Sequence, residues 1–206
     1  MAELNLSNDM RVGFLGFTGS GKTFAAEKLL EDQPRVIVVD PKKRVNFPGY
    51  HLTENPAAAL LEPKTIFRPR GTIPNSFWGD CKETLHEAGG GIVYIDELAV
   101  ITTPQTIPSE LRDLLNTGRE LGVGVWYAAQ AASEIPNTAL RGSNVLILFV
   151  NVGASDRDKI IRIAGDVGEI TAHLDFRQFV VVELANRAYD PDSIPVYTIN
   201  SNMVTA

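Results

Sequence analysis

The sequence contains a single cysteine, Cys81, among its 206 residues, so it can form no internal disulfide. This composition fits a reducing compartment and excludes the small secreted scaffolds that depend on disulfides. The sequence also contains no long hydrophobic run. The longest, Val145 to Val150, is far shorter than the roughly 20 residues that a membrane-spanning helix needs. We therefore expect no transmembrane segment.

The first nine residues include neither a basic segment nor an apolar one, so we expect no secretory signal and a soluble, intracellular chain. Basic residues are also fewer than acidic residues. The chain has 19 Lys and Arg against 25 Asp and Glu, which gives a net charge of −6 and an isoelectric point near 5.1. This balance excludes a protein that coats nucleic acid through general positive charge, although it leaves room for a local basic track.

Apolar, β-branched runs alternate with helical stretches along most of the chain, which predicts an α/β fold with a mostly parallel sheet flanked by helices. The expected strands cover residues 11–16, 35–40, 92–96, 123–130 and 145–151. The expected helices cover residues 22–31, 77–88, 108–121 and 155–164. With 44% hydrophobic residues and no linker or repeat, residues 1–206 are expected to form one domain.

Two regions depart from this alternation. Residues 41–76 contain six prolines and little periodicity, apart from a short expected strand at 65–68. Near the C-terminus, residues 179–184 and 196–199 are expected to pair as an antiparallel hairpin at the edge of the sheet.

Residues 16–23 read GFTGSGKT, which matches the phosphate-binding pattern G-x-x-x-x-G-K-[ST] between an expected strand and an expected helix. Glycines let the backbone N–H groups surround a phosphate, and the helix N-terminus adds positive charge. Lys22 is expected to reach the β- and γ-phosphates of ATP, and Thr23 to ligate Mg²⁺. The residues predicted to bind the nucleotide are Gly16, Phe17, Thr18, Gly19, Ser20, Gly21, Lys22 and Thr23.

A second acidic element, IVYIDE, covers residues 92–97. Asp96 ends an apolar strand, where its carboxylate can hold Mg²⁺ beside the phosphate-binding loop. Glu97 follows directly and is placed to activate a water for attack on the γ-phosphate. This acidic pair favours nucleotide hydrolysis over nucleotide sensing.

Two more polar residues are candidates for the catalytic site. Gln130 ends the strand VGVWYAAQ and is expected to face the γ-phosphate as a sensor or water-positioning group. Arg119 precedes that strand and could reach the nucleotide of a neighbouring subunit as a trans-acting arginine finger. Arg112 and Arg141 are competing candidates for the same role.

The ordered set GFTGSGKT, VIVVDPKKR, IVYIDE and TGRELGVGVWYAAQ, followed by SEIP, resembles the HerA–FtsK superfamily of P-loop ATPases. Within that superfamily the chain is most similar to the genome-packaging ATPases of tailless icosahedral viruses with an internal membrane. The resemblance covers residues 11–150. It implies a P-loop NTPase fold of the RecA/ASCE type, with core motifs at 11–150 and an antiparallel C-terminal edge over 151–206.

The resemblance also implies roles and partners. It assigns phosphate and metal binding to Lys22 and Thr23, Mg²⁺ to Asp96, the catalytic base to Glu97 and γ-phosphate sensing to Gln130. It further implies an ATP-hydrolysing translocase for double-stranded DNA, working as a homo-hexameric ring and gripping DNA of any sequence. Viral capsid or membrane vertex proteins would be further partners, in the host cytoplasm or at the packaging vertex of the virion.

Residues 35–70 carry a local charge of +4, which leaves −10 for the rest of the chain. This basic segment could face the DNA phosphates once several copies surround the duplex. Its seven basic residues are Arg35, Lys42, Lys43, Arg44, Lys64, Arg68 and Arg70.

Three other functions stay open at this point. They are a P-loop ATPase for phage assembly or extrusion, a scaffold that uses nucleotide to hold an assembly together, and a small-metabolite kinase. A GTPase switch is excluded because the sequence contains neither D-x-x-G nor N-K-x-D.

Overall fold

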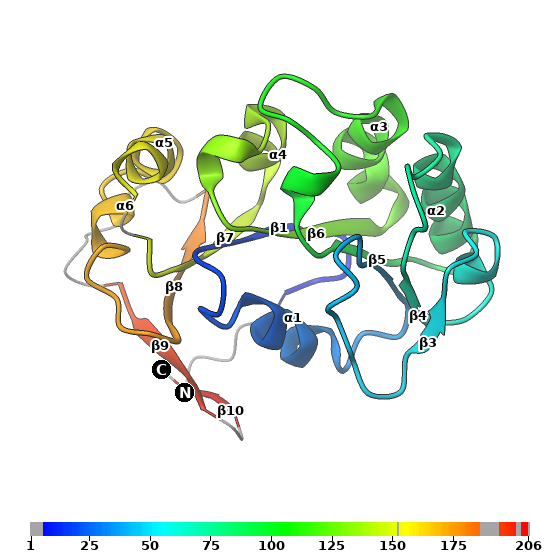
Figure 1. Ribbon diagram of the computed structural model, residues 1–206, viewed down its shortest axis with the longest axis horizontal. Coiled ribbons are helices and arrows are strands. Elements are labelled where there is room, and N and C mark those ends of the chain that lie inside the picture. Colours follow the sequence, from blue (N-terminus) through cyan, green and yellow to red (C-terminus); the bar gives the residue numbers. More distant parts are fainter. Residues whose placement is uncertain (1–5, 152, 186–193, 201–202, 206) are drawn as a thin grey trace.

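The computed structural model describes residues 6–151, 153–185, 194–200 and 203–205 (Figure 1). Its strands are β1 (Arg11–Leu15), β2 (Val36–Val39), β3 (His51–Thr53), β4 (Lys64–Phe67), β5 (Gly91–Ile95), β6 (Val123–Ala129), β7 (Val145–Phe149), β8 (Gln178–Glu183), β9 (Val196–Asn200) and β10 (Met203–Thr205). They form one ten-stranded sheet in the order β10-β9-β8-β7-β1-β6-β5-β2-β4-β3. The strands from β7 to β3 run parallel, and β8 to β10 add an antiparallel edge.

The helices cover both faces of this sheet. They are α1 (Lys22–Leu30), α2 (Ser76–Glu87), α3 (Ser109–Thr117), α4 (Asn137–Gly142), α5 (Ala154–Ala164) and α6 (Val167–Ile170). Helix α1 lies on one face, whereas α2 to α5 lie on the other (Figure 1). Among the described helices, none is long and apolar enough to cross a membrane.

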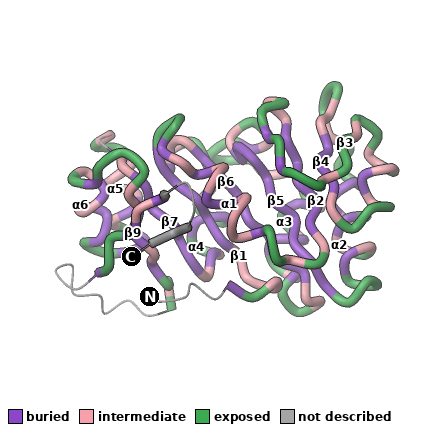
Figure 2. The backbone as a smooth tube through the Cα atoms, turned by 90° about the horizontal axis from the view of Figure 1, so that it is seen from below, coloured by how far each residue is buried: buried purple, intermediate pink, exposed green. Residues whose placement is uncertain are grey.

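Each face of the sheet has its own hydrophobic core. Phe14 and Trp126 point towards the α1 face, with ring centroids 6.0 Å apart. Their neighbours Leu15 and Tyr127 point to the opposite face and pack with the helices there. The central strands are therefore buried on both sides, which explains why they read as continuous apolar runs rather than alternating ones (Figure 2).

The predicted fold class is confirmed, including the antiparallel pairing of β8 with β9, in which Phe179 lies opposite Tyr197. The expected helix over 108–121 is wrong in part, because α3 ends at Thr117 and a 3₁₀ turn covers Gly118–Leu121. The chain packs closely here: a Cβ at Gly118 would lie 2.8 Å from the Val123 carbonyl oxygen. Strand β3, in the proline-rich region, was not predicted because His51 and Leu52 are exposed and show no apolar alternation.

The strand registers bring the carboxyl ends of four parallel strands side by side. Leu15 at the end of β1 pairs with Ala129 at the end of β6. Ile95 at the end of β5 pairs with Tyr127 of β6 and with Val39 at the end of β2. The residues that follow these four parallel strands therefore come together, as expected for ligand sites in α/β sheets.

Candidate nucleotide-binding site

The loop between β1 and α1 has the backbone geometry of a phosphate-binding loop. Gly16 and Gly21 have positive φ angles of 151° and 108°, which side chains rarely allow. A Cβ at Gly16 would lie 2.6 Å from the Phe149 Cβ, and one at Gly21 would lie 2.7 Å from the Ile199 Cδ1. Conformation thus favours glycine at both positions, and at Gly16 the Phe149 Cβ also leaves no space for a side chain.

Lys22, the first residue of α1, turns back over this loop. Its side-chain ammonium donates hydrogen bonds to the carbonyl oxygens of Gly16 at 2.6 Å and Phe17 at 2.7 Å. Burial lowers the pKa of Lys22 to about 8, because an ammonium is poorly solvated there. The ammonium of Lys22 therefore lies within the loop, and its contact with the β- and γ-phosphates stays a prediction.

Thr23 and Asp96 form the pair that would hold Mg²⁺. The Thr23 hydroxyl donates to Asp96 Oδ1 at 3.0 Å, and the buried Tyr94 hydroxyl donates to the same oxygen at 3.0 Å. Burial raises the pKa of Asp96. Hydroxyl and carboxylate oxygens suit Mg²⁺, which takes few protein ligands and completes its shell with phosphate and water oxygens. Among the described residues, no group of three or more His, Cys, Asp or Glu lies close enough together to hold a metal ion.

Glu97 is held in an unusual conformation at the end of β5. Its φ of 79° is positive, and it is 7% exposed. Its Oε1 accepts a hydrogen bond from the Gln130 backbone N–H at 3.2 Å. Its Oε2 accepts from Gln130 Nε2 at 2.7 Å and from Lys42 Nζ at 3.0 Å. Backbone strain of this kind costs ~1–3 kcal/mol and often marks functional sites, and here three hydrogen bonds help to hold it.

One cavity of about 180 Å³ collects these groups. It is lined by Thr18, Gly19, Lys22, Thr23, Lys42, Arg44, Asp96, Glu97, Ala128 and Gln130. The structure therefore brings the acidic pair and Gln130 together with four of the eight predicted loop residues. The other four, Gly16, Phe17, Ser20 and Gly21, do not line this cavity. Sequence reasoning missed Lys42 and Arg44 as members of this site, although both follow a strand that ends at the same edge of the sheet.

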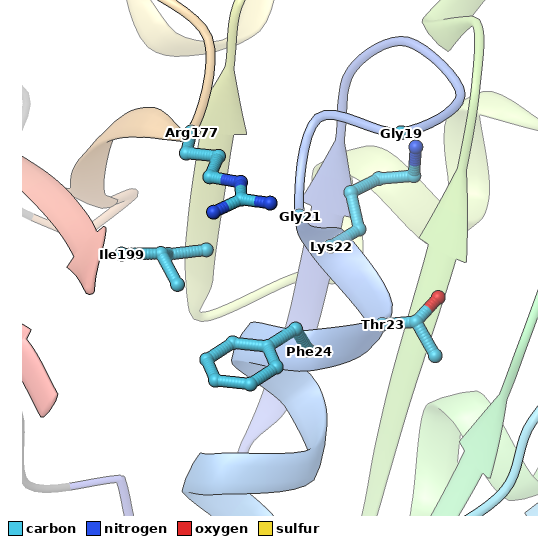
Figure 3. Close-up of a pocket in the computed structure, with 7 residues that line it drawn as sticks. All are labelled: Gly19, Gly21, Lys22, Thr23, Phe24, Arg177 and Ile199. Carbon is cyan, nitrogen blue, oxygen red and sulfur yellow. The ribbon is translucent and has the colours of Figure 1, made fainter. Parts of the chain in front are cut away.

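A second cavity, of about 480 Å³, lies between α1 and the antiparallel edge of the sheet and shares Gly19, Lys22 and Thr23 with the first. Figure 3 shows the side chains of Phe24, Ile199 and Arg177 around this space. Sequence reasoning missed these three residues. Two of them are more than 150 positions away from the phosphate-binding loop, and no local pattern marks them.

Arg119 lies away from both cavities. It belongs to the 3₁₀ turn at the N-terminal end of β6, whereas Gln130 follows the C-terminal end of the same strand. A seven-residue strand separates the two residues by roughly 20 Å. The Arg119 side chain is 55% exposed, with its Nε 3.5 Å from Asp9 Oδ2. It could therefore contact a nucleotide only on another copy of the chain, and Arg112 and Arg141 are also exposed.

The basic segment 35–70 is less available to DNA than its composition suggests. Lys42 pairs with Glu97, Arg68 with the buried Asp40, and both Lys43 and Arg70 with Glu54. Four of its seven basic residues are thus paired with carboxylates, and a fifth, Lys64, donates a hydrogen bond to the Glu31 carbonyl oxygen. A DNA-facing role for this segment stays a prediction.

Asp40 organises the loop after β2. It is fully buried, and its carboxylate accepts hydrogen bonds from the backbone N–H groups of Arg44 and Val45 and from Arg68 Nε, each at 3.0 Å. Asp40→Ala should lower the free energy of unfolding by about 3 kcal/mol, because it leaves the Arg68 charge without its partner. Urea denaturation measures the loss. The control Glu54→Ala removes an exposed carboxylate that also pairs with two cations, and it should shift the midpoint far less. Equal shifts would contradict this assignment.

A mostly parallel sheet with a glycine-rich loop and a buried lysine between its first strand and first helix defines the fold of the P-loop NTPases. Solved structures share this fold along almost the whole chain. The genome packaging NTPase B204 of Sulfolobus turreted icosahedral virus 2, in complex with AMPPCP, matches with a TM-score of 0.80 and 15% identity, over 92% of this chain and 97% of that chain.

Two further structures give the same result. B204 described as the DNA-packaging ATPase of Sulfolobus turreted icosahedral virus matches with a TM-score of 0.76 and 15% identity, over 93% of this chain and 98% of that one. EssC (ATPases 2 and 3) from Geobacillus thermodenitrificans matches with a TM-score of 0.58 and 16% identity, over 88% of this chain and 41% of that one. No family model matches the chain. The structural neighbours therefore support the predicted P-loop NTPase fold.

Proposed function

We propose that this protein hydrolyses ATP to translocate double-stranded DNA, as the packaging motor of a viral genome. The observation that carries the proposal is the convergence of Lys22, Thr23, Asp96, Glu97 and Gln130 on one cavity. Its support includes the likeness in fold, over nearly the full length of both chains, to packaging NTPases. ATP and Mg²⁺ are the nucleotide and ion that these residue types suit.

In this mechanism, the loop N–H groups and Lys22 hold the β- and γ-phosphates. Thr23 and Asp96 would hold Mg²⁺, which when bound neutralises charge on the phosphate oxygens. Glu97 accepts a proton from a water whose oxygen forms a bond to the γ-phosphorus, while the bond from that phosphorus to the β,γ-bridging oxygen breaks. The products are ADP and inorganic phosphate. Gln130 donates a hydrogen bond to Glu97 and follows strand β6 directly. In this mechanism it senses the loss of the γ-phosphate and transmits that change to β6.

The cavity around Phe24, Ile199 and Arg177 is our candidate for the adenine and ribose. It adjoins the phosphate-binding loop, combines apolar walls with one guanidinium, and has a volume in the range of small-molecule sites. We further propose a single domain over residues 1–206 that assembles as a homo-hexameric ring, with Arg119 acting on the site of the next subunit. Capsid or membrane vertex proteins would be its partners, and the host cytoplasm or the virion packaging vertex its location.

The steady-state ATPase rate, with and without linear double-stranded DNA, tests the proposal. We expect stimulation of several-fold by two DNAs of unrelated sequence, rising with protein concentration and weakening with salt, because phosphate contacts release counterions. A Lys22→Ala variant gives the baseline for contaminating activity. Hydrolysis indifferent to DNA would contradict the translocase and point to an assembly ATPase or a nucleotide-dependent scaffold. Phosphate transfer to a small acceptor would instead identify a kinase.

A further inference from the structure

Lys42 lies between the predicted catalytic base and the phosphate-binding loop. Its Nζ is 3.0 Å from Glu97 Oε2, and the lysine lines the same cavity as Lys22 and Gly19. The Lys42 side chain is 31% exposed, whereas that of Glu97 is 9% exposed. The contact therefore joins a buried carboxylate to an ammonium that faces the space where we place the γ-phosphate.

The backbone beneath Lys42 is firmly anchored. The hydrogen bonds of the Asp40 carboxylate to the N–H groups of Arg44 and Val45 close the loop on both sides of it. Lys43, the next residue, has a positive φ of 56°. These hydrogen bonds hold the loop, and the flexible four-carbon side chain of Lys42 is long enough to carry its ammonium between two positions.

The contacts of Glu97 indicate why Lys42 would change its position when a nucleotide binds. Glu97 Oε2 accepts from both Gln130 Nε2 and Lys42 Nζ, so the ammonium competes with a water for the oxygen that would take its proton. A terminal phosphate carries more negative charge than one carboxylate and offers three acceptor oxygens. In the same cavity it would compete with Glu97 for Lys42. The Lys42 ammonium would thus leave Glu97 for the terminal phosphate, and the Glu97 carboxylate would become available to accept a proton from water.

We propose that Lys42 is a further catalytic residue with two positions, paired with Glu97 before ATP binds and on the γ-phosphate oxygens afterwards. This inference rests on the proposed ATP hydrolysis. In the second position the ammonium stabilises the charge that spreads over the γ-phosphate oxygens during attack. The cation comes from the same chain as the nucleotide and acts in addition to any arginine from a neighbour.

Nucleotide binding separates this role from a structural one. We expect Lys42→Ala to lower the preference for ATPγS over ADP by about 10-fold with unchanged ADP affinity, and to lower kcat by about 100-fold. Lys42→Arg keeps the charge and should retain part of the preference for ATPγS and part of kcat. The matched control is Lys28→Ala, which removes a lysine of similar exposure that pairs with Glu31 and lies outside the basic segment. It should leave the preference and kcat as in the unmodified protein.

A double-mutant cycle adds a readout that does not depend on turnover. Glu97→Gln releases Lys42 from its ion pair, so it should raise the affinity for ATP, and this gain should shrink when Lys42→Ala is also present. An unchanged preference for ATPγS over ADP in Lys42→Ala would overturn the proposal. If hydrolysis were also faster in that variant, Lys42 would only restrain Glu97. If the unmodified protein binds no nucleotide, the proposed function itself fails, and that outcome is distinct from the other two.

Discussion

Replacement of Glu97 by glutamine is expected to lower kcat for ATP hydrolysis by about 10²–10⁴-fold without any loss of ATP affinity. The amide matches the carboxylate in shape and can still accept a hydrogen bond from the Gln130 backbone, so the strained turn should persist. It cannot take a proton from water. The lost step is therefore proton acceptance alone.

Single-turnover hydrolysis measures this loss, and titration with a fluorescent ATP analogue checks that binding survives. Glu87→Gln is the matched control, since Glu87 is an exposed glutamate at the end of α2, on a different part of the surface. Its rate should equal that of the unmodified protein. If Glu97→Gln keeps more than about a tenth of the turnover, Glu97 is not the base.

Removal of the Arg119 side chain is expected to lower turnover by about 10³-fold, the smaller end of the range for arginine fingers. The side chain is 55% exposed, and its ion pair with Asp9 is long at 3.5 Å, so Arg119→Ala should cost little stability. Arg119 and Gln130 lie at opposite ends of strand β6. The expected loss of turnover therefore has to come from contact between copies of the chain. Nucleotide binding to the isolated chain should be unchanged.

Mixing variants tests this directly. Arg119→Ala keeps a complete phosphate site but has no finger, whereas Glu97→Gln keeps the finger but has an inactive site. Mixed rings should therefore show more activity than the two variants measured separately. Arg112→Ala and Arg141→Ala, the competing candidates, should hydrolyse at the normal rate if Arg119 is the finger. A normal rate in Arg119→Ala would exclude it, and the same mixing experiment would then identify which of the other two acts.

Much of the parallel core was predictable because its signals are local. Runs such as Val36–Val39 and Val145–Phe149 are apolar throughout, which is typical of strands covered on both faces. The regions that sequence reasoning missed lack such a signal. Strand β3 is exposed at the sheet edge, and the short helix α4 has only six residues, too few for a clear helical period.

The predicted charge distribution shows where composition misleads. Residues 35–70 are basic as a set, yet Arg68 compensates the buried Asp40, and Lys42 contacts Glu97, which is 55 positions away. A count of charges along the chain cannot reveal which of them are paired in space. The structure therefore moves Lys42 from an expected DNA surface into the phosphate cavity.

The sequence by itself determined the phosphate-binding loop, the acidic pair at the end of its strand and the α/β class, because glycine geometry, strand burial and helix initiation act over a few neighbouring residues. Only the tertiary structure decided which strands are neighbours. By inserting β6 between β1 and β5, it placed Gln130 against Glu97, and by setting β2 beside β5 it brought in Lys42. Strand order depends on packing and hydrogen bonding between segments that are far apart in the chain, and a local pattern carries no record of such partners.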